Sequence, residues 1–127
     1  MLHWLGFCGL NQEVLALRDR PIDLEPQLRS AARWYHALSG MPAGKAKFPW
    51  MALRVRRICS TRQPDVVICW HNGFSSAVLL GARLAGVRCL LTHGGNPPTP
   101  TLGGKLYTAY TTFMLSLAGA KMVCCSR

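Results

Sequence analysis

Two histidines directly follow short apolar runs in the sequence, and each of these runs is a predicted strand. His71 follows residues 66–70, and His93 follows residues 87–92. If these runs are neighbouring parallel strands, about 4.8 Å apart, the two imidazoles share one sheet edge, roughly 5 to 10 Å from each other. Open parallel sheets bind ligands at that edge, beyond the carboxyl ends of the strands. Both histidines are therefore candidate ligand-binding residues; the alternative is that each only satisfies backbone groups at a strand end.

The residues beside these histidines offer backbone groups to a ligand. Asn72 and Gly73 lead into a predicted helix start, whose N–H groups favour anions, although simple capping explains them equally. Gly94 and Gly95 would let a ligand approach the backbone closely, or they form an ordinary turn. Neither G-x-G-x-x-G nor G-x-x-x-x-G-K-[ST] occurs in the sequence, which argues against a dinucleotide-binding fold and a P-loop enzyme.

Acidic residues are few and lie only in the first half of the chain. No carboxylate follows Asp65, so residues 66–127 supply neither a carboxylate pair nor an acidic catalytic base. The six cysteines lack C-x-x-C spacing, and three of them stand in apolar runs typical of buried strands. We predict that these thiols pack as small hydrophobes in a reducing cytosol, and that the chain needs no metal and no cofactor.

Length and composition indicate one folded domain. The chain has 127 residues, of which 50% are hydrophobic and 16% charged, which excludes a disordered tail. The uncharged stretch at residues 106–120 is shorter than the roughly 20 apolar residues that span a bilayer. A formal net charge of +10 favours an anionic partner.

Short apolar runs alternate with helix-like segments along the chain. Strands are predicted at residues 13–17, 33–38, 66–70, 87–92 and 121–125, and helices at 24–32, 50–62, 74–85 and 105–117. Ser75 or Asn72 is the expected N-cap of the third helix, and the run at 66–70 is typical of a strand buried on both faces. This order predicts an α/β fold, a mostly parallel sheet with helices on both faces.

The predicted helix at residues 50–62 is basic and amphipathic. Arg54, Arg56 and Arg57 lie away from its apolar side. A solvated helix face is one interpretation of these arginines. The other is contact with anionic lipid headgroups, to which each basic residue near the surface contributes about 1 kcal/mol.

Four segments in this order resemble the N-terminal domain of family-4 glycosyltransferases. Residues 63–71 (QPDVVICWH) look like that family's "rPDVVhaH" strand, and residues 85–94 are similar to its "gvpvvvtvHg". Residues 120–126 are similar to "Adrviavs", and residues 28–38 to "LraaGvrvhaL". The resemblance covers roughly residues 13–127. The family's opening Gly-Gly loop has at most a remnant here, in residues 6–9, and its E-x7-E carboxylates have no counterpart.

The resemblance implies a Rossmann-like domain that is one half of a GT-B fold. Residues 1–127 would be a single, incomplete glycosyltransferase domain that binds an acceptor glycan or lipid-linked acceptor. A nucleotide-sugar donor would bind only with the missing C-terminal domain, so the isolated chain is expected to be inactive. We expect a cytoplasmic location, with peripheral contact at the inner face of an anionic membrane. The resemblance implies His93 as the catalytic residue, and the candidate acceptor-binding residues are His71, Asn72, Gly73, Gly94, Gly95 and Ser126.

Two other interpretations stay open. The chain is compatible with a non-catalytic accessory, a degenerate half that pairs with a separate donor domain. It is also compatible with a small basic anion-binding module. We expect no nucleic-acid partner, because the basic residues are not interleaved with exposed aromatics along one predicted face.

Overall fold

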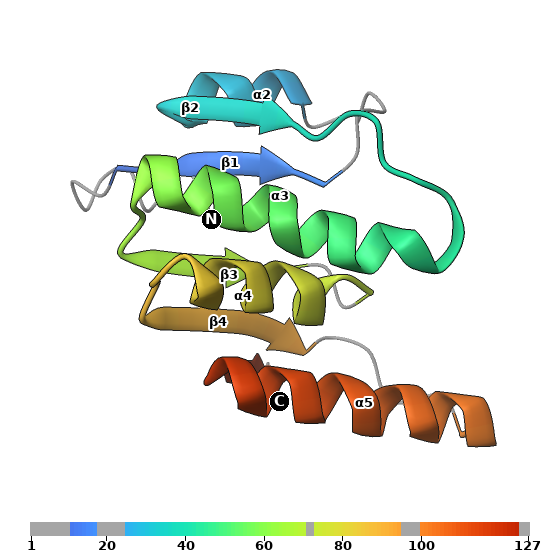
Figure 1. Ribbon diagram of the computed structural model, residues 1–127. Coiled ribbons are helices and arrows are strands. Elements are labelled where there is room, and N and C mark those ends of the chain that lie inside the picture. Colours follow the sequence, from blue (N-terminus) through green and yellow to red (C-terminus); the bar gives the residue numbers. More distant parts are fainter. Residues whose placement is uncertain (1–10, 18–24, 71–72, 95–99, 125–127) are drawn as a thin grey trace. The chain divides into compact units, whose positions relative to one another are not determined.

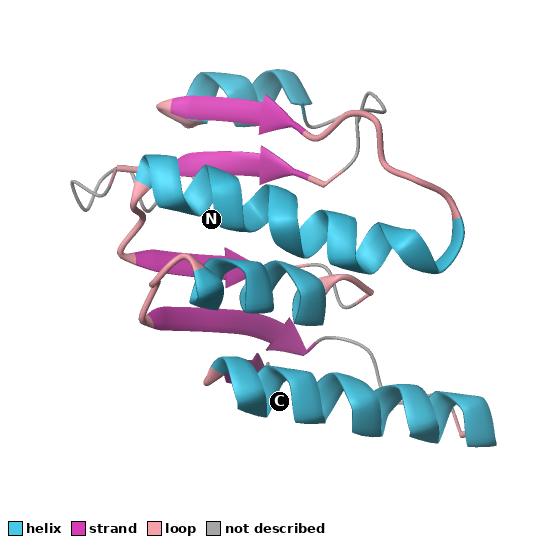
Figure 2. Ribbon diagram, viewed as in Figure 1, coloured by secondary structure: helices cyan, strands magenta, loops and turns pink. Residues whose placement is uncertain are grey.

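The computed structural model describes residues 11–17, 25–70, 73–94 and 100–124, in which short strands alternate with helices (Figures 1 and 2). The chain divides into two compact units, Met1–Met41 and Pro42–Arg127. That residues 1–127 form a single domain stays a prediction. In chain order the elements are β1 (Glu13–Ala16), α2 (Glu25–Ala31), β2 (Trp34–Ala37), the short 3-10 helix η1 (Gly44–Ala46), α3 (Lys47–Arg62), β3 (Val66–Cys69), α4 (Ser75–Leu84), β4 (Cys89–Gly94), α5 (Leu102–Ala118) and β5 (Lys121–Cys124).

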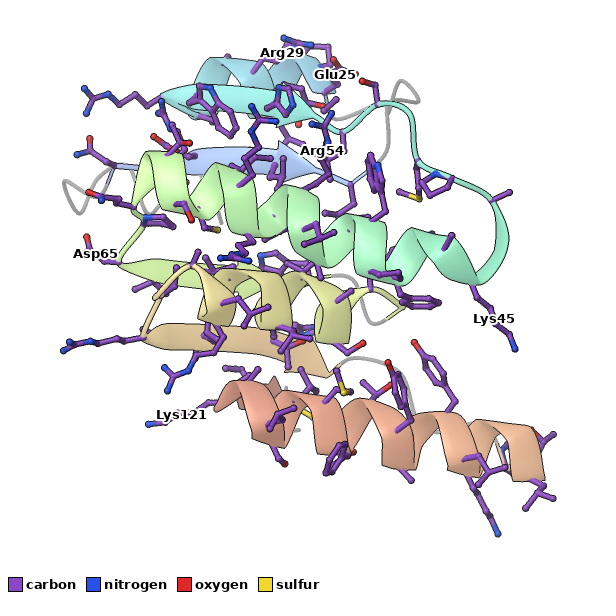
Figure 3. All side chains as sticks on the ribbon, viewed as in Figure 1. Glu25, Arg29, Lys45, Arg54, Asp65 and Lys121 are labelled. Atoms are coloured by element: carbon purple, nitrogen blue, oxygen red, sulfur yellow. The ribbon has the colours of Figure 1, made fainter. Side chains whose placement is uncertain are left out.

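The first unit holds one βαβ motif. Strands β1 and β2 are parallel and pair from Glu13 opposite Trp34 to Ala16 opposite Ala37, with α2 between them in the chain. On α2 the guanidinium of Arg29 lies 2.7 Å from the carboxylate of Glu25, and the two side chains are labelled in Figure 3. The same guanidinium stacks 4.4 Å from the centre of the Tyr35 ring, which attaches the helix to β2.

The second unit holds a three-stranded parallel sheet in the order β3-β4-β5. Val66 pairs with Cys89 at the start of β3, and Gly94 pairs with Cys124 at the end of β4. The α/β class and the parallel strands predicted from the sequence are therefore confirmed. Strand β4 occupies residues 89–94 instead of 87–92, because pairing with β5 continues its ladder through His93 and Gly94.

Helices α3, α4 and α5 form one layer against this sheet, with α4 in the middle (Figure 1). Seven of the ten residues of α4 are buried, and Leu79 and Ala82 have no exposed surface. At Gly81 the backbone of α3 comes so close that an added Cβ would overlap the carbonyl oxygen of Ala52. The core of the unit therefore depends on a close approach of two helices.

Within the described part of residues 42–127, no helix covers the opposite face of the three-stranded sheet. Val66 and Ile68 are 46% and 44% exposed, so the prediction that this strand is buried on both faces is wrong. Two crossovers that step in the same direction along the sheet, with the usual right-handed sense, put their helices on one face. Within this sheet the described helices accordingly cover one side only. Cys69 is buried as predicted, but Cys89 is exposed because it lies on the open face.

Both ends of α5 have the geometry that stops a helix. Thr101 is the N-cap, and its hydroxyl accepts a hydrogen bond from the N–H of Gly104 at 3.1 Å. Gly119 adopts a left-handed conformation, with φ of 67°, which glycine adopts without a Cβ penalty. The N-cap predicted for the helix at residues 74–85, Ser75 or Asn72, is wrong, because the N-cap of α4 is Phe74, which makes no side-chain cap hydrogen bond.

Replacing Thr101 by alanine is expected to lower the free energy of unfolding by about 1 kcal/mol, because one N–H at the start of α5 loses its partner. Thr101→Ser keeps the hydroxyl and should retain most of the stability of the original chain. Equilibrium unfolding in urea measures both variants. Equal midpoints for the two substitutions would contradict the capping role of Thr101.

Candidate functional site

The carboxyl end of the three-stranded sheet brings two aromatic side chains together. Trp70 directly follows β3 and His93 is the fifth residue of β4, the neighbouring parallel strand. Their ring centroids are 5.2 Å apart, and the ring planes are inclined at 34°. Trp70 is 56% exposed and His93 is half-buried. A ligand can therefore contact both rings at the edge where open parallel sheets bind their ligands.

Strand alternation decides which face of the sheet carries this pair. Leu90 and Thr92 are buried on the helical side, and the Thr92 hydroxyl donates a hydrogen bond of 3.3 Å to the carbonyl oxygen of Cys69. Because successive side chains in a strand point to opposite faces, His93 belongs to the open face, as does Trp70 beyond Ile68. The pair thus stands at one corner of the uncovered face.

Gly73, two positions before α4, is bonded to α5. The Tyr107 hydroxyl donates a hydrogen bond of 3.1 Å to the carbonyl oxygen of Gly73. Next along the chain, the ring of Phe74 packs at 5.8 Å from that of Phe48, and the ammonium of Lys47 lies 5.4 Å from both ring centres. These contacts from α3 and α5 hold Gly73 and Phe74 at the start of α4.

The predicted site residues are only partly covered by the described chain. His93 lies at the carboxyl end of β4 as expected, and Gly94 is the last residue of that strand, opposite Cys124. Gly73 lies two positions before α4 and is tied to Tyr107. The remaining predicted site residues, His71, Asn72, Gly95 and Ser126, lie outside the described residues.

Two residues of this site were not predicted from the sequence. Trp70 was assigned to the strand core, although its place at the end of an apolar run next to His71 was a usable signal. Tyr107 lies 34 residues from its partner Gly73, and no local pattern in the sequence indicates that contact.

The arginines of α3 lie apart from the Trp70–His93 pair. Arg54, Arg56 and Arg57 are exposed and belong to the helical layer, whereas the pair belongs to the open face of the sheet. The Arg54 guanidinium lies 5.6 Å from the centre of the Trp50 ring, which orients this labelled side chain in Figure 3. The structure therefore separates the predicted anion contact from the predicted acceptor contact.

Burial affects the acidity of one described thiol. Burial raises the pKa of the Cys59 thiol, which keeps it protonated and unreactive at neutral pH. Among the described residues no group of three or more His, Cys, Asp or Glu side chains is placed to hold a metal ion. The described helices also include none with the length and apolarity to cross a membrane.

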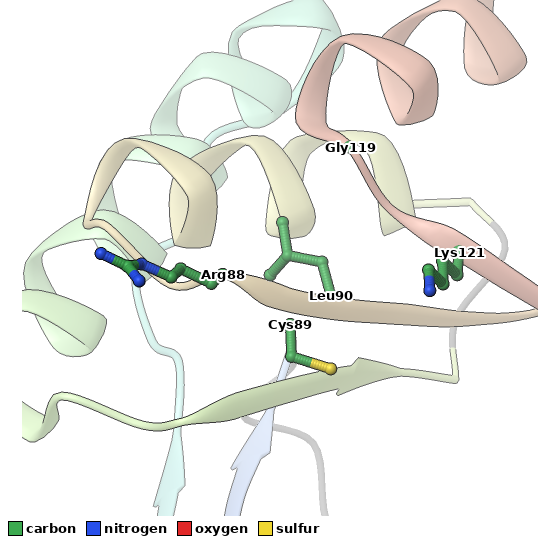
Figure 4. Close-up of a pocket in the computed structure, with 5 residues that line it drawn as sticks. All are labelled: Arg88, Cys89, Leu90, Gly119 and Lys121. Carbon is green, nitrogen blue, oxygen red and sulfur yellow. The ribbon is translucent and has the colours of Figure 1, made fainter.

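A shallow pocket lies at the opposite end of the same sheet (Figure 4). Its residues belong to the amino ends of β4 and β5 or precede them, which is the edge where parallel sheets rarely bind ligands. We therefore place the candidate site at Trp70 and His93. The pocket is lined by Arg88, Cys89, Leu90, Gly119 and Lys121.

Comparison with known proteins gives no match for this chain. No protein-family model matches the chain, and no curated protein or solved structure matches it either.

Proposed function

We propose that this chain is the N-terminal, acceptor-binding half of a glycosyltransferase, which transfers a sugar from a nucleotide-sugar donor to an acceptor hydroxyl. The proposal rests on the ordered resemblance of four segments to family-4 glycosyltransferases and on one structural observation. That observation is the Trp70–His93 pair, with 5.2 Å between ring centres, at the carboxyl edge of two adjacent parallel strands.

The two rings suit the recognition of a saccharide. Trp70 offers a half-exposed indole face on which the apolar side of a sugar ring can stack. His93 offers an imidazole that can exchange a hydrogen bond or a proton with an acceptor hydroxyl. The Tyr107–Gly73 hydrogen bond of 3.1 Å holds Gly73 before the ligand arrives, which lowers the entropy cost of binding.

The donor belongs to a different domain in this proposal. Residues 66–127 hold no carboxylate, so this half lacks the E-x7-E pair that the resemblance associates with the nucleotide-sugar site. The division of labour predicts that the chain binds acceptor saccharides alone and that transfer requires the donor-binding domain. Arg54, Arg56 and Arg57 would face anionic headgroups if the acceptor is lipid-linked.

Chemical-shift mapping on the isotopically labelled chain tests this function. We expect neutral oligosaccharides to shift the resonances of Trp70, Gly73, His93 and Gly94 in a saturable manner. His93→Ala should weaken this binding, because an acceptor hydroxyl loses its polar partner. No saturable shift with any oligosaccharide of a broad acceptor panel, or shifts confined to the amino ends of the strands, would contradict the proposal.

A further inference from the structure

Helix α5 turns its largest apolar side chains away from the sheet. Five of them lie at i, i+4, i+8, i+11 and i+15, and at 3.6 residues per turn they fall within about 80° of the helix surface. They are between 50% and 75% exposed. We call this set the apolar stripe of α5: Leu102, Leu106, Tyr110, Phe113 and Leu117.

The side of α5 that packs inward carries mostly small residues. Leu115 and Ala118 are buried, and the half-buried residues are Gly104, Thr108, Thr111 and Met114. An ordinary surface helix shows the reverse pattern, with its large apolar residues toward the core and its polar residues toward water. The side chains of the apolar stripe therefore take no part in the core of this unit. A contiguous exposed apolar surface of this kind marks an interaction site.

The charge of the unit indicates what this surface contacts. Residues 42–127 hold eleven Lys and Arg side chains against one acidic residue, Asp65, so the unit carries the whole net charge of +10. Helix α5 has no acidic residue and one lysine, Lys105. A second copy of the chain would bring an equal positive charge and be repelled, whereas an anionic bilayer attracts the unit and accepts apolar side chains.

We infer that the apolar stripe of α5 inserts into the interface of an anionic lipid bilayer, while the basic residues of the same unit draw it to the headgroups. Three leucines with Tyr110 and Phe113 are typical of interfacial helices, whose apolar face enters the boundary between headgroups and acyl chains. Single-stranded nucleic acid fits less well, because base stacking needs aromatic faces lined by basic residues, and α5 offers one lysine. This inference does not depend on sugar transfer.

Co-sedimentation with lipid vesicles tests the inference. We expect the chain to bind vesicles with roughly one third phosphatidylglycerol and to bind pure phosphatidylcholine at least about tenfold more weakly. The double variant Leu106→Gln with Phe113→Gln should lower partition into anionic vesicles at least about tenfold. The matched control, Thr112→Gln with Ser116→Gln, changes two exposed residues of the same helix outside the stripe and should bind like the original chain.

Each of the following outcomes would overturn the inference. One is equal binding of anionic vesicles by the stripe variant and the original chain, or no binding by the original chain. The second is a dimer of the original chain that the stripe variant abolishes, which would assign the stripe to a second copy. The third is binding of a single-stranded oligonucleotide that the stripe variant loses. Hydrogen exchange on the unmodified chain needs no variant: vesicles should protect α5, and unchanged exchange there would also contradict the inference.

Discussion

Replacing Gly81 by alanine is expected to destabilise the unit of residues 42–127 by about 3 kcal/mol, the upper part of the usual range for overpacking. The added Cβ would overlap the carbonyl oxygen of Ala52 and lie 3.0 Å from its carbonyl carbon and 3.1 Å from its Cα. These are backbone atoms of α3, so relief requires the two helices to separate. Because α4 is the central helix of the layer, separation from α3 loosens the core around Leu79.

Equilibrium unfolding in urea measures this effect, and Gly103→Ala provides the matched control. Gly103 is also a helical glycine, on α5, and an added Cβ there meets no atom within 4 Å. The control should leave stability unchanged or raise it by up to about 1 kcal/mol, since alanine favours helix. Equal midpoints for the original chain and Gly81→Ala would contradict the close approach of α3 and α4.

Replacing Trp70 by alanine is expected to weaken oligosaccharide binding about 30-fold, which corresponds to about 2 kcal/mol, a typical loss for a central aromatic contact. The indole is a large exposed apolar ring at the carboxyl edge, and its centroid lies 5.2 Å from that of the His93 ring. Because Trp70 is 56% exposed, its removal leaves little cavity, and stability should change by less than binding. Titration calorimetry with the oligosaccharide that gives the largest chemical shifts measures this loss.

Phe113→Ala is the control for this substitution. It removes an aromatic ring that is 65% exposed from the apolar stripe of α5, away from the sheet, and should leave oligosaccharide binding unchanged. If Trp70→Ala retains the original affinity while Phe113→Ala loses it, the acceptor site has been assigned to the wrong surface. The pair of variants also separates saccharide binding from lipid binding, since the opposite pattern is expected on anionic vesicles.

The alternation of strands and helices was predictable because it depends on local patterns of apolar and polar residues. The apolar run at residues 66–70 and the helical pattern at 74–85 needed only neighbours in the chain, and both elements lie within two residues of their predicted ends. The end of β4 was displaced by two residues because its last two positions are fixed by pairing with β5. That pairing joins segments about thirty residues apart, and a local pattern does not encode it.

Which face of each strand or helix is buried was harder to predict than where the strands and helices occur. A run such as Val66 to Cys69 has the same composition whether one face or two are covered, and the direction of the crossovers decided that Ile68 is exposed. In α5, Thr108 and Thr111 lie on the inward side, where Thr108 donates a hydrogen bond of 2.9 Å to the carbonyl oxygen of Gly104.

The sequence predicted at which edge of the sheet the candidate site lies, but not which side chains contact each other there. His93 was expected beyond a strand because parallel strands present their carboxyl ends together, and it lies there. The aromatic partner at that edge is Trp70, because the register of β3 and β4, with Cys69 opposite Thr92, brings the next residue of each strand together. Register depends on the packed sheet, so the sequence alone did not distinguish Trp70 from its neighbours.

The central claim is that this chain binds the acceptor and leaves the nucleotide-sugar to another domain. Titration calorimetry of the unmodified chain, with a panel of nucleotide-sugars and with acceptor oligosaccharides, tests both parts together. The account predicts saturable heat with an oligosaccharide that depends on Trp70 and His93, and no saturable heat with any nucleotide-sugar at millimolar concentration. Tight binding of a nucleotide-sugar, or binding of neither ligand class, would contradict it.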